Sequence, residues 1–288
     1  MTATLPRNGS HSGEPDALEI NALLAQLRIA KGAVDKKEWL SADLAGGPTV
    51  SLDTINSTGS PLSTLDSSGM GFLTPMVSFL DEPLNQLRGD PSPVSSGANE
   101  FDGAARNGTA VAEEYRSTAS GQTSEWSGQA ASDYLSKGTE LADGILSIAE
   151  TALTTAKGLI GAGQAVAKTV ADVTTLINEA VGRIVPIMSK AIAEAPMTFG
   201  QSIAAAIPEC VGIAVECAGK IAGKMAELLS SGENLIKIID GSVGVVKLVK
   251  EVLTFIGKQS QGGTPSTAKP SSEQPANPLP AQPVRISR

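Results

Sequence analysis

Residues 124–134, SEWSGQAASDY, decide the fold because they separate two long segments that both have the apolar periodicity of amphipathic helices. Gly128 can adopt the positive φ that a tight turn requires. Trp126, two residues earlier, is large enough to cover the open end of two adjacent helices. The sequence therefore predicts a helical hairpin at this place rather than an active site.

The segment from 90 to 119 predicts the first helix of the hairpin. Its apolar and small residues alternate at spacings of four and three, which places them on one stripe of a helix. The stripe consists of Val94, Ala98, Phe101, Ala105, Gly108, Ala112, Tyr115 and Ala119. We expect Asp90 to cap the helix start through its carboxylate, followed by Pro91, whose missing N–H costs nothing there. Gly121 lies just past the stripe and is expected to end the helix in a left-handed conformation.

The segment after the turn predicts a second and longer helix. Its stripe also alternates by four and three and shifts once by an extra step of four, which is a stutter in the repeat. The stripe consists of Tyr134, Gly138, Leu141, Ile145, Ile148, Ala152, Thr155, Leu159, Ala162, Val166, Val170, Val173, Ile177, Ala180, Ile184, Ile187 and Ala191. We expect a bend or break at Gly158, Gly161 and Gly163. Pro186 and Pro196 mark a second weak point, because a proline inside a helix removes a hydrogen bond.

The composition favours an all-α fold. The chain has 288 residues, of which 41% are hydrophobic and only 3% aromatic, so its core must consist mainly of aliphatic side chains. Segments poor in apolar residues or rich in Gly, Ser, Thr and Pro divide the chain. The predicted organisation is a disordered tail at 1–14, a short amphipathic helix at 15–31, a flexible linker at 32–70, a helical hairpin domain at 71–195, C-terminal helices at 196–257 and a disordered, proline-rich tail at 258–288. The C-terminal part is expected to form two helices, at 208–229 and 233–256, which complete an elongated bundle.

The residue inventory argues against enzymatic chemistry. His11 is the only histidine and lies in the predicted N-terminal tail, so neither a catalytic triad nor a histidine-ligated zinc site has a rigid histidine to use. The glycines near Lys157 do not follow a predicted strand, which excludes a phosphate-binding loop. The net charge of −8 and the dispersed basic residues argue against nucleic-acid binding. We therefore expect no enzyme activity, no cofactor and no metal.

Two cysteines, Cys210 and Cys217, lie on the same face of a predicted helix. Two turns of helix separate their Cα atoms by about 10.5 Å, which is too far for a disulfide. We expect both thiols to be buried in the core, where a free cysteine packs as a small hydrophobic residue.

A membrane interaction is an open alternative. The start of the chain, MTATLPRNGSHSGEPD, has no apolar stretch typical of a secretory signal peptide, and no uncharged apolar run reaches the ~18 residues of a membrane span. Apolar helices rich in alanine and glycine at 199–256 can nevertheless insert into a bilayer after a rearrangement. A buried core helix has the same pattern.

The hairpin with its Trp126-Ser127-Gly128 turn resembles the WxG family of small helical hairpins that actinobacterial type VII secretion systems export. The run WSGQAASDY is similar to that family in placing small residues and an aromatic after the turn. The lead-in FLTPMVSFLDEPLNQLRGDPSPV, at 72–94, resembles that of larger actinobacterial proteins with an N-terminal WxG-like trafficking domain. The resemblance covers residues 71 to about 195. It implies a dimer with another WxG-like hairpin protein or with a second copy, and recognition by the type VII machinery or a chaperone.

The resemblance also implies export without a signal peptide. The chain would be cytoplasmic before export and then secreted or located at the cell surface. The family's Tyr-x-x-x-Asp/Glu export signal is missing, because the residues four positions after Tyr115 and Tyr134 are Ala119 and Gly138. By analogy, either a partner chain supplies the signal or this chain is not itself exported.

These observations together predict a non-enzymatic, type VII secretion-associated protein that acts through helix–helix recognition. Trp126 and Gly128 would shape the turn. The packing or partner seam would consist of Val94, Phe101, Tyr115, Tyr134, Leu141, Ile145 and Ile148. If the Trp126 ring is buried, its replacement by alanine should cost about 3 to 5 kcal/mol. Two alternatives stay open: a membrane-inserting or pore-forming helical protein, and an intracellular structural bundle.

Overall fold

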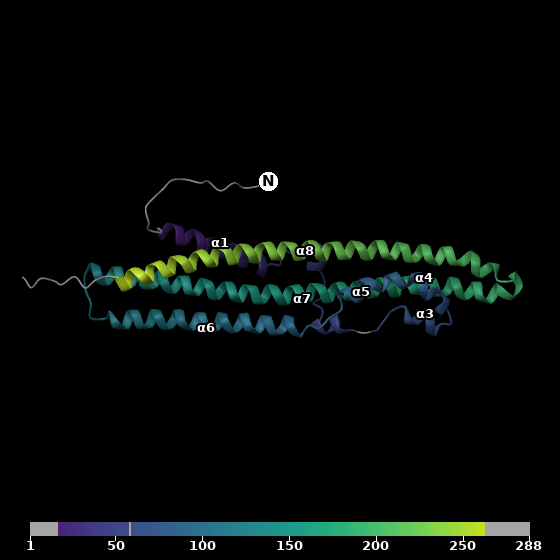
Figure 1. Cartoon of the computed structure of the whole chain (residues 1–288), viewed down its shortest axis with the longest axis horizontal. Helices are drawn as coiled ribbons and strands as arrows, with labels where there is room; N and C mark the ends of the chain where they lie inside the picture. The colour runs from purple at the N-terminus through teal and green to yellow at the C-terminus, as the bar shows by residue number, and fades with distance from the viewer. Residues whose placement is uncertain (1–16, 58, 263–288) are drawn as a thin grey trace, which may run out of the picture.

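The computed structural model describes residues 17–57 and 59–262, and in this part of the chain every regular element is a helix. The predicted all-α fold is confirmed as an elongated bundle (Figure 1). Its three long helices are α6 at Ser92–Gln122, α7 at Gln129–Thr198 and α8 at Gln201–Gly262. The predicted tail at 1–14 lies outside the described residues, as does the predicted tail at 258–288 apart from its first five residues, which continue α8.

The helix α7 is the longest in the bundle and packs against α1, α6 and α8. It has 70 residues and is therefore about 105 Å long at a rise of about 1.5 Å per residue. α6, with 31 residues, lies antiparallel along the first half of α7, while α8 returns along α7 from the far end (Figure 1). A single long helix thus contacts every other layer of the molecule.

The N-terminal part of the chain packs along the sides of α7. The elements are α1 (Ala17–Asp35), α2 (Ala42–Ala45), η1 (Leu52–Asn56), α3 (Ser63–Ser67), η2 (Gly71–Leu73), α4 (Thr74–Val77), η3 (Ser78–Leu80) and α5 (Glu82–Leu87). α1 packs against both α7 and α8, and the Nζ of Lys157 on α7 lies 2.8 Å from a carboxylate oxygen of Asp35 at its end. The elements from α3 to α5 lie along the second half of α7, beyond the start of α6 (Figure 1).

The prediction of a flexible linker at 32–70 is wrong. Trp39 is 3% exposed, Leu65 is fully buried, and Leu44, Ile55 and Leu62 are also buried. The segments between these residues form turns and short helices that bring the apolar side chains into the core, Trp39 in one cluster and Leu62 and Leu65 in another. Composition averaged over the segment hides this arrangement, because a few well-placed apolar residues are enough to fix a short helix against a large neighbour.

The main core lies in the second half of α7, between α8 and the short N-terminal helices. Its fully buried large side chains include Leu65, Leu73, Leu80, Leu84, Val170, Val173, Ile177, Ile184, Met188 and Ile221. The second half of the predicted α7 stripe is therefore confirmed as a core face. The prediction for Cys210 and Cys217 is also confirmed, since both are free and buried, and burial raises the pKa of both thiols.

The predicted bend at Gly158, Gly161 and Gly163 does not occur, because α7 is continuous through all three. A Cβ at 161 would lie 3.0 Å from the indole of Trp39, and one at 163 would lie 2.7 Å from a methyl carbon of Leu52. The glycines therefore make room for neighbours on three sides of α7 instead of breaking it.

The predicted weak point at Pro186 and Pro196 and the predicted gap between the helices at 208–229 and 233–256 are absent as well. Pro186 and Pro196 lie inside α7 and Pro208 inside α8, each on an exposed side of its helix, as are the residues four positions earlier. Water can therefore reach the carbonyl groups that lose their N–H partner. Ser231 is 1% exposed, and its hydroxyl accepts a hydrogen bond of 2.9 Å from the backbone N–H of Ser41. The two C-terminal helices that the sequence predicts are one helix.

Candidate partner interface

The turn between α6 and α7 has the geometry that its glycine predicts. Gly128 has φ 89° and ψ −174°, a conformation that favours glycine, and the first turn of α7 follows immediately. The predicted left-handed end of α6 at Gly121 is wrong. α6 ends at Gln122, and Thr123 follows with φ −101°, its hydroxyl donating to the carbonyl of Ala119 at 2.8 Å. A threonine side chain thus satisfies a carbonyl at the helix end.

Trp126 does not cover the open end of the hairpin. Its side chain is 56% exposed, and its ring centroid lies 5.5 Å from that of Tyr134 at an angle of 52° between the rings. The small residues Ala119, Thr123 and Ala131 are buried at this end instead. The prediction of a buried indole is therefore wrong, and with it the large stability cost of losing the ring. An exposed tryptophan in tilted contact with a tyrosine is available to a partner.

The start of α6 lies two residues after the predicted cap. Ser92 is the first helical residue, and Pro91 precedes the helix rather than occupying its first position. The carboxylate of Asp90 accepts a hydrogen bond of 2.8 Å from the backbone N–H of Ser92. Hydrogen bonds from the side chain and then the backbone of Ser92 lower the pKa of Asp90. The predicted role of Asp90, acceptor at the helix start, is confirmed.

Small residues form the centre of the contact between α6 and α7. The buried residues of α6 recur once per heptad at Ala98, Ala105, Ala112 and Ala119, and those of α7 include Gly138, Ala142, Ala149 and Ala156. A Cβ at Gly108 would lie only 2.9 Å from the Cβ of Ala149. The two helix backbones therefore approach closely along an alanine- and glycine-lined seam.

The predicted seam of large side chains needs correction for this reason. Phe101 is 42% exposed and Tyr134 is 40% exposed, because a closely packed pair of helices has no room for aromatic rings between them. The remaining five residues of that prediction are half-buried: Val94, Tyr115, Leu141, Ile145 and Ile148. Tyr115 lies beside Gly138, whereas Ile148 packs against the cluster around Leu24 and Val249 on α1 and α8. The large side chains flank the seam.

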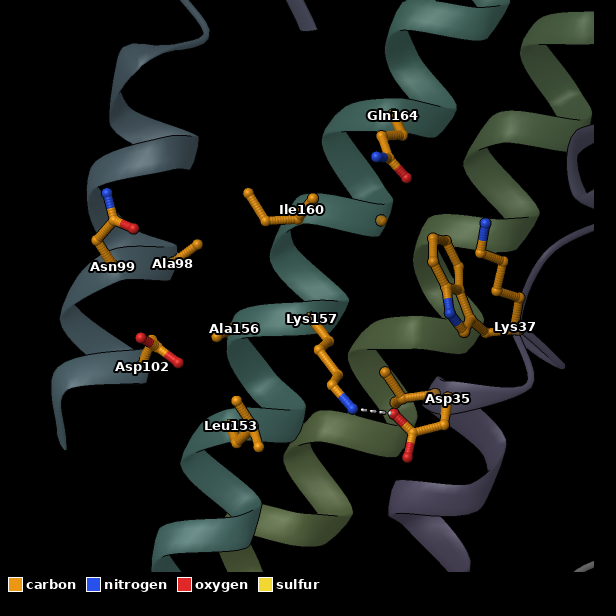
Figure 2. Close-up of a pocket in the computed structure, with 13 residues that line it drawn as sticks. Asp35, Lys37, Ala98, Asn99, Asp102, Leu153, Ala156, Lys157, Ile160 and Gln164 are labelled. Atoms are coloured by element: carbon orange, nitrogen blue, oxygen red, sulfur yellow. Dashed lines mark hydrogen bonds and ion pairs between the residues drawn. The ribbon is translucent and has the colours of Figure 1, made fainter. Parts of the chain in front are cut away.

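A groove of about 490 Å³ runs beside this seam, between α6 and the end of α1. Figure 2 shows α7 as its floor, with Leu153, Ala156 and Ile160 between the two walls. Ala98, Asn99 and Asp102 of α6 form one wall, and the opposite wall is formed by Val34, Asp35, Lys37 and Trp39. The groove is therefore apolar at its base and polar at both edges.

The charges at the groove are placed at its edges. The Nζ of Lys157 lies 2.8 Å from a carboxylate oxygen of Asp35, so this lysine is drawn toward the α1 wall (Figure 2). Asp102, on the α6 wall, pairs with Arg106 one turn along. An apolar base with polar edges suits the apolar face of an amphipathic helix better than a small polar substrate.

The sequence contains no local signal for this groove. Its walls come from residues 34–39, 98–102 and 153–164, and only the packing of α1 against α7 brings them together. Trp39 in particular lay in the segment that composition predicts to be a linker.

Comparisons with known proteins give no relative for this chain. No protein-family model, no curated protein and no solved structure matches the chain. Among the residues that the structure describes, no group of three or more His, Cys, Asp and Glu side chains is placed to hold a metal ion. The turn, the small-residue seam and the groove are therefore the features from which a function can be argued.

Proposed function

We propose that this chain is a non-enzymatic, type VII secretion-associated protein, either a secreted substrate or a trafficking adaptor. It acts through helix–helix recognition by the hairpin of α6 and α7. The observation that carries the proposal is the Trp126-Ser127-Gly128 turn, in which Gly128 has the positive φ of a tight turn and Trp126 is exposed beside Tyr134. An exposed aromatic pair at the end of a helical hairpin serves recognition better than stability.

The partner that this surface fits is another WxG-like helical hairpin or a second copy of the chain. A helix laid along the groove between α6 and α1 would bury its apolar face on Ala156 and Ile160 and place polar residues near Asp102 and Asp35. Such a partner would also supply the Tyr-x-x-x-Asp/Glu signal that this chain lacks. The complex would be cytoplasmic before export, would be recognised by the type VII machinery or a chaperone, and would then be secreted or held at the cell surface.

The first test follows export. In an actinobacterial host with an intact type VII apparatus, the full chain, co-expressed with its neighbouring gene products, should appear in the culture supernatant. It should stay in the cells when the apparatus is disrupted. Equal supernatant levels in both strains would contradict the proposal, and retention in both would favour an intracellular structural bundle.

The second test addresses the turn. Trp126→Ala should change the free energy of unfolding by less than about 1 kcal/mol, because the ring is already more than half exposed. It should nevertheless weaken the one-to-one complex with a hairpin partner, measured by size exclusion with mass detection. Val111→Ala is the matched control, since Val111 is 51% exposed on α6. Equal complex formation by both variants would show that the turn is not part of the interface.

A further inference from the structure

The loop between α7 and α8 forms the far tip of the bundle (Figure 1). α7 ends at Thr198, Phe199 and Gly200 turn the chain, and α8 begins at Gln201. Phe199 is 97% exposed and Met197 is 81% exposed, the two highest values among the large hydrophobic side chains that the structure describes. This end of the bundle therefore presents two strongly exposed apolar side chains.

The backbone holds Phe199 in this outward position. Phe199 has φ 51° and ψ 38°, a left-handed conformation that residues with a Cβ rarely adopt. Gly200 also has a positive φ, at 83°. A glycine at 199 would fit this turn without strain, so the phenylalanine is not what the turn requires.

Several backbone and hydroxyl groups at the tip are paired within the tip. The backbone N–H groups of Phe199 and Gly200 both donate to the carbonyl of Ala195. The hydroxyl of Ser202 donates to the carbonyl of Ala191 at 2.7 Å, and the backbone N–H of Ser202 donates to the hydroxyl of Thr198 at 3.3 Å. Pairing of these groups lowers the free energy needed to move the tip out of water.

The distribution of charge limits how far the tip can enter an apolar medium. Residues 195–208 carry no charged side chain, and the nearest charges along the chain are Glu194 and Glu209. Glu194 precedes Phe199 by five residues, or about 7 Å along a helix. This is within the ~5 to 10 Å to which interfacial segments enter the boundary between lipid headgroups and acyl chains.

We propose that the α7–α8 tip is a lipid-contacting site, in which Phe199 and Met197 insert shallowly into the interface of a bilayer while the rod stays outside. Because the charge nearest to Phe199 along the chain is the carboxylate of Glu194, the site prefers a neutral, zwitterionic surface to an anionic one. This contact does not depend on the proposed secretion function, since it uses the end of the bundle opposite to the α6–α7 turn, which carries Trp126 (Figure 1).

Spanning by α8 is a separate possibility. By length and composition alone, residues Gln201–Thr254 of α8 are apolar enough to cross a membrane, and only 28% of the most apolar window is buried. Spanning would require α8 to leave α7, whereas insertion of the tip leaves every contact between these helices in place. The two modes therefore differ in whether the bundle survives membrane binding.

The experiment uses the full chain with phosphatidylcholine vesicles. Phe199→Trp, in a Trp126→Phe background, should show a blue shift of its emission and quenching by brominated lipid when vesicles are added, because the remaining Trp39 is buried. Ile29→Trp in the same background is the control, since Ile29 is 73% exposed on α1 away from the tip. It should show neither change.

The second variant, Phe199→Gly, removes the ring and relieves the left-handed strain. It should be at least as stable to heat as the natural chain, yet bind the vesicles more weakly by roughly ten- to a hundredfold, as loss of a buried aromatic side chain predicts. Ile236→Ala, an exposed apolar position on α8, should bind unchanged. Phosphatidylglycerol vesicles should bind the natural chain more weakly than phosphatidylcholine at low salt.

Three results would overturn the proposal. Equal vesicle binding by Phe199→Gly and the natural chain would show that the tip is not the site. A blue shift of Phe199→Trp that needs no vesicles and grows with protein concentration would show that a second copy covers the tip. Loss of the α7–α8 contact on binding, detected as faster hydrogen exchange in α7 around Leu176, whose carbonyl accepts from the thiol of Cys217, would show insertion of α8 instead.

Discussion

Replacing Gly108 by alanine should destabilise the protein even though alanine is the better helix former. A Cβ at this position would lie 2.9 Å from the Cβ of Ala149 and 3.6 Å from its Cα. These atoms cannot swing aside as the end of a long side chain can. Carbon atoms that do not repel each other need about 3.5 to 4 Å, so α6 has to move away from α7 by somewhat less than about 1 Å.

The expected magnitude combines two opposing effects. Overpacking of a close contact costs about 1 to 3 kcal/mol, and alanine gains about 1 kcal/mol over glycine within a helix. The net free energy of unfolding should therefore fall by about 0 to 2 kcal/mol. Gly103→Ala is the matched control, because a Cβ at 103, on the same helix, meets nothing within 4 Å. It should gain stability, so the two variants should differ by about 1 to 3 kcal/mol.

The assay is denaturant unfolding followed by helical circular dichroism, in which the midpoint reports stability if the slope is unchanged. The double variant Gly108→Ala with Ala149→Gly restores the space and should show a favourable coupling of about 1 kcal/mol or more. If Gly108→Ala is as stable as Gly103→Ala, the close approach of α6 and α7 is wrong. The contact between the small residues of α6 and α7 would then not be as close as described.

Two further predictions concern the N-terminal segment and the surface charges. Leu65→Ala should cost about 2 to 5 kcal/mol in a thermal or denaturant melt, because Leu65 is fully buried; a flexible linker would show no change. Glu216→Gln should flatten the loss of stability at acid pH. Hydrogen bonds and charges from Lys220 and Arg183 lower the pKa of Glu216 below its usual 4.5, so its contribution is complete above that value and disappears as the pH falls through the lower folded pKa. Unfolding midpoints measured from pH 6 down to about pH 3 should converge for the two proteins; parallel curves would exclude the ion-pair contribution.

Local periodicity was sufficient to predict the parts of the fold that depend on one helix at a time. The stripe from Val170 to Ala191 indicated a core face, and Gly128 indicated a turn with positive φ. Both depend on interactions between near neighbours or on a regular repeat. The packing of Cys210 and Cys217 followed in the same way from their spacing on one face.

The features that were predicted wrongly from the sequence depend on tertiary contacts. Gly161 and Ser231 look like helix breakers, but one makes room for Trp39 and the other accepts a hydrogen bond from Ser41. A small residue in a helical sequence can either interrupt the helix or let a neighbouring element approach closely. Only the identity of the neighbour in the folded protein distinguishes these two roles. The buried position of Leu65 was hidden for the same reason, because much of the cluster in which it is buried, from Val170 to Ile221, lies more than a hundred residues later in the chain.

The groove beside α6 was beyond prediction because it needs three distant segments. Trp39 contributes one wall only after α1 has packed on α7 and α8. Trp126, by contrast, was visible in the sequence, and its motif indicated the turn correctly. The exposure of its ring was not predictable, since it follows from alanines that already fill the hairpin end.

The packing of α1 and its following turn against α8 also sets an order of events during synthesis. The contact of Ser41 with Ser231 joins residues 190 positions apart, and Leu24 packs on Val249, which lies still further along the chain. At about 5 to 20 residues per second, a ribosome needs roughly 10 to 40 s to make the chain between Ser41 and Ser231. The hairpin of α6 and α7 is complete in sequence when Thr198 has been added, about 2 to 7 s before Ser231. During synthesis, the α6–α7 hairpin is therefore present while the apolar side of α1 is still uncovered. That side is covered only when α8 has been made.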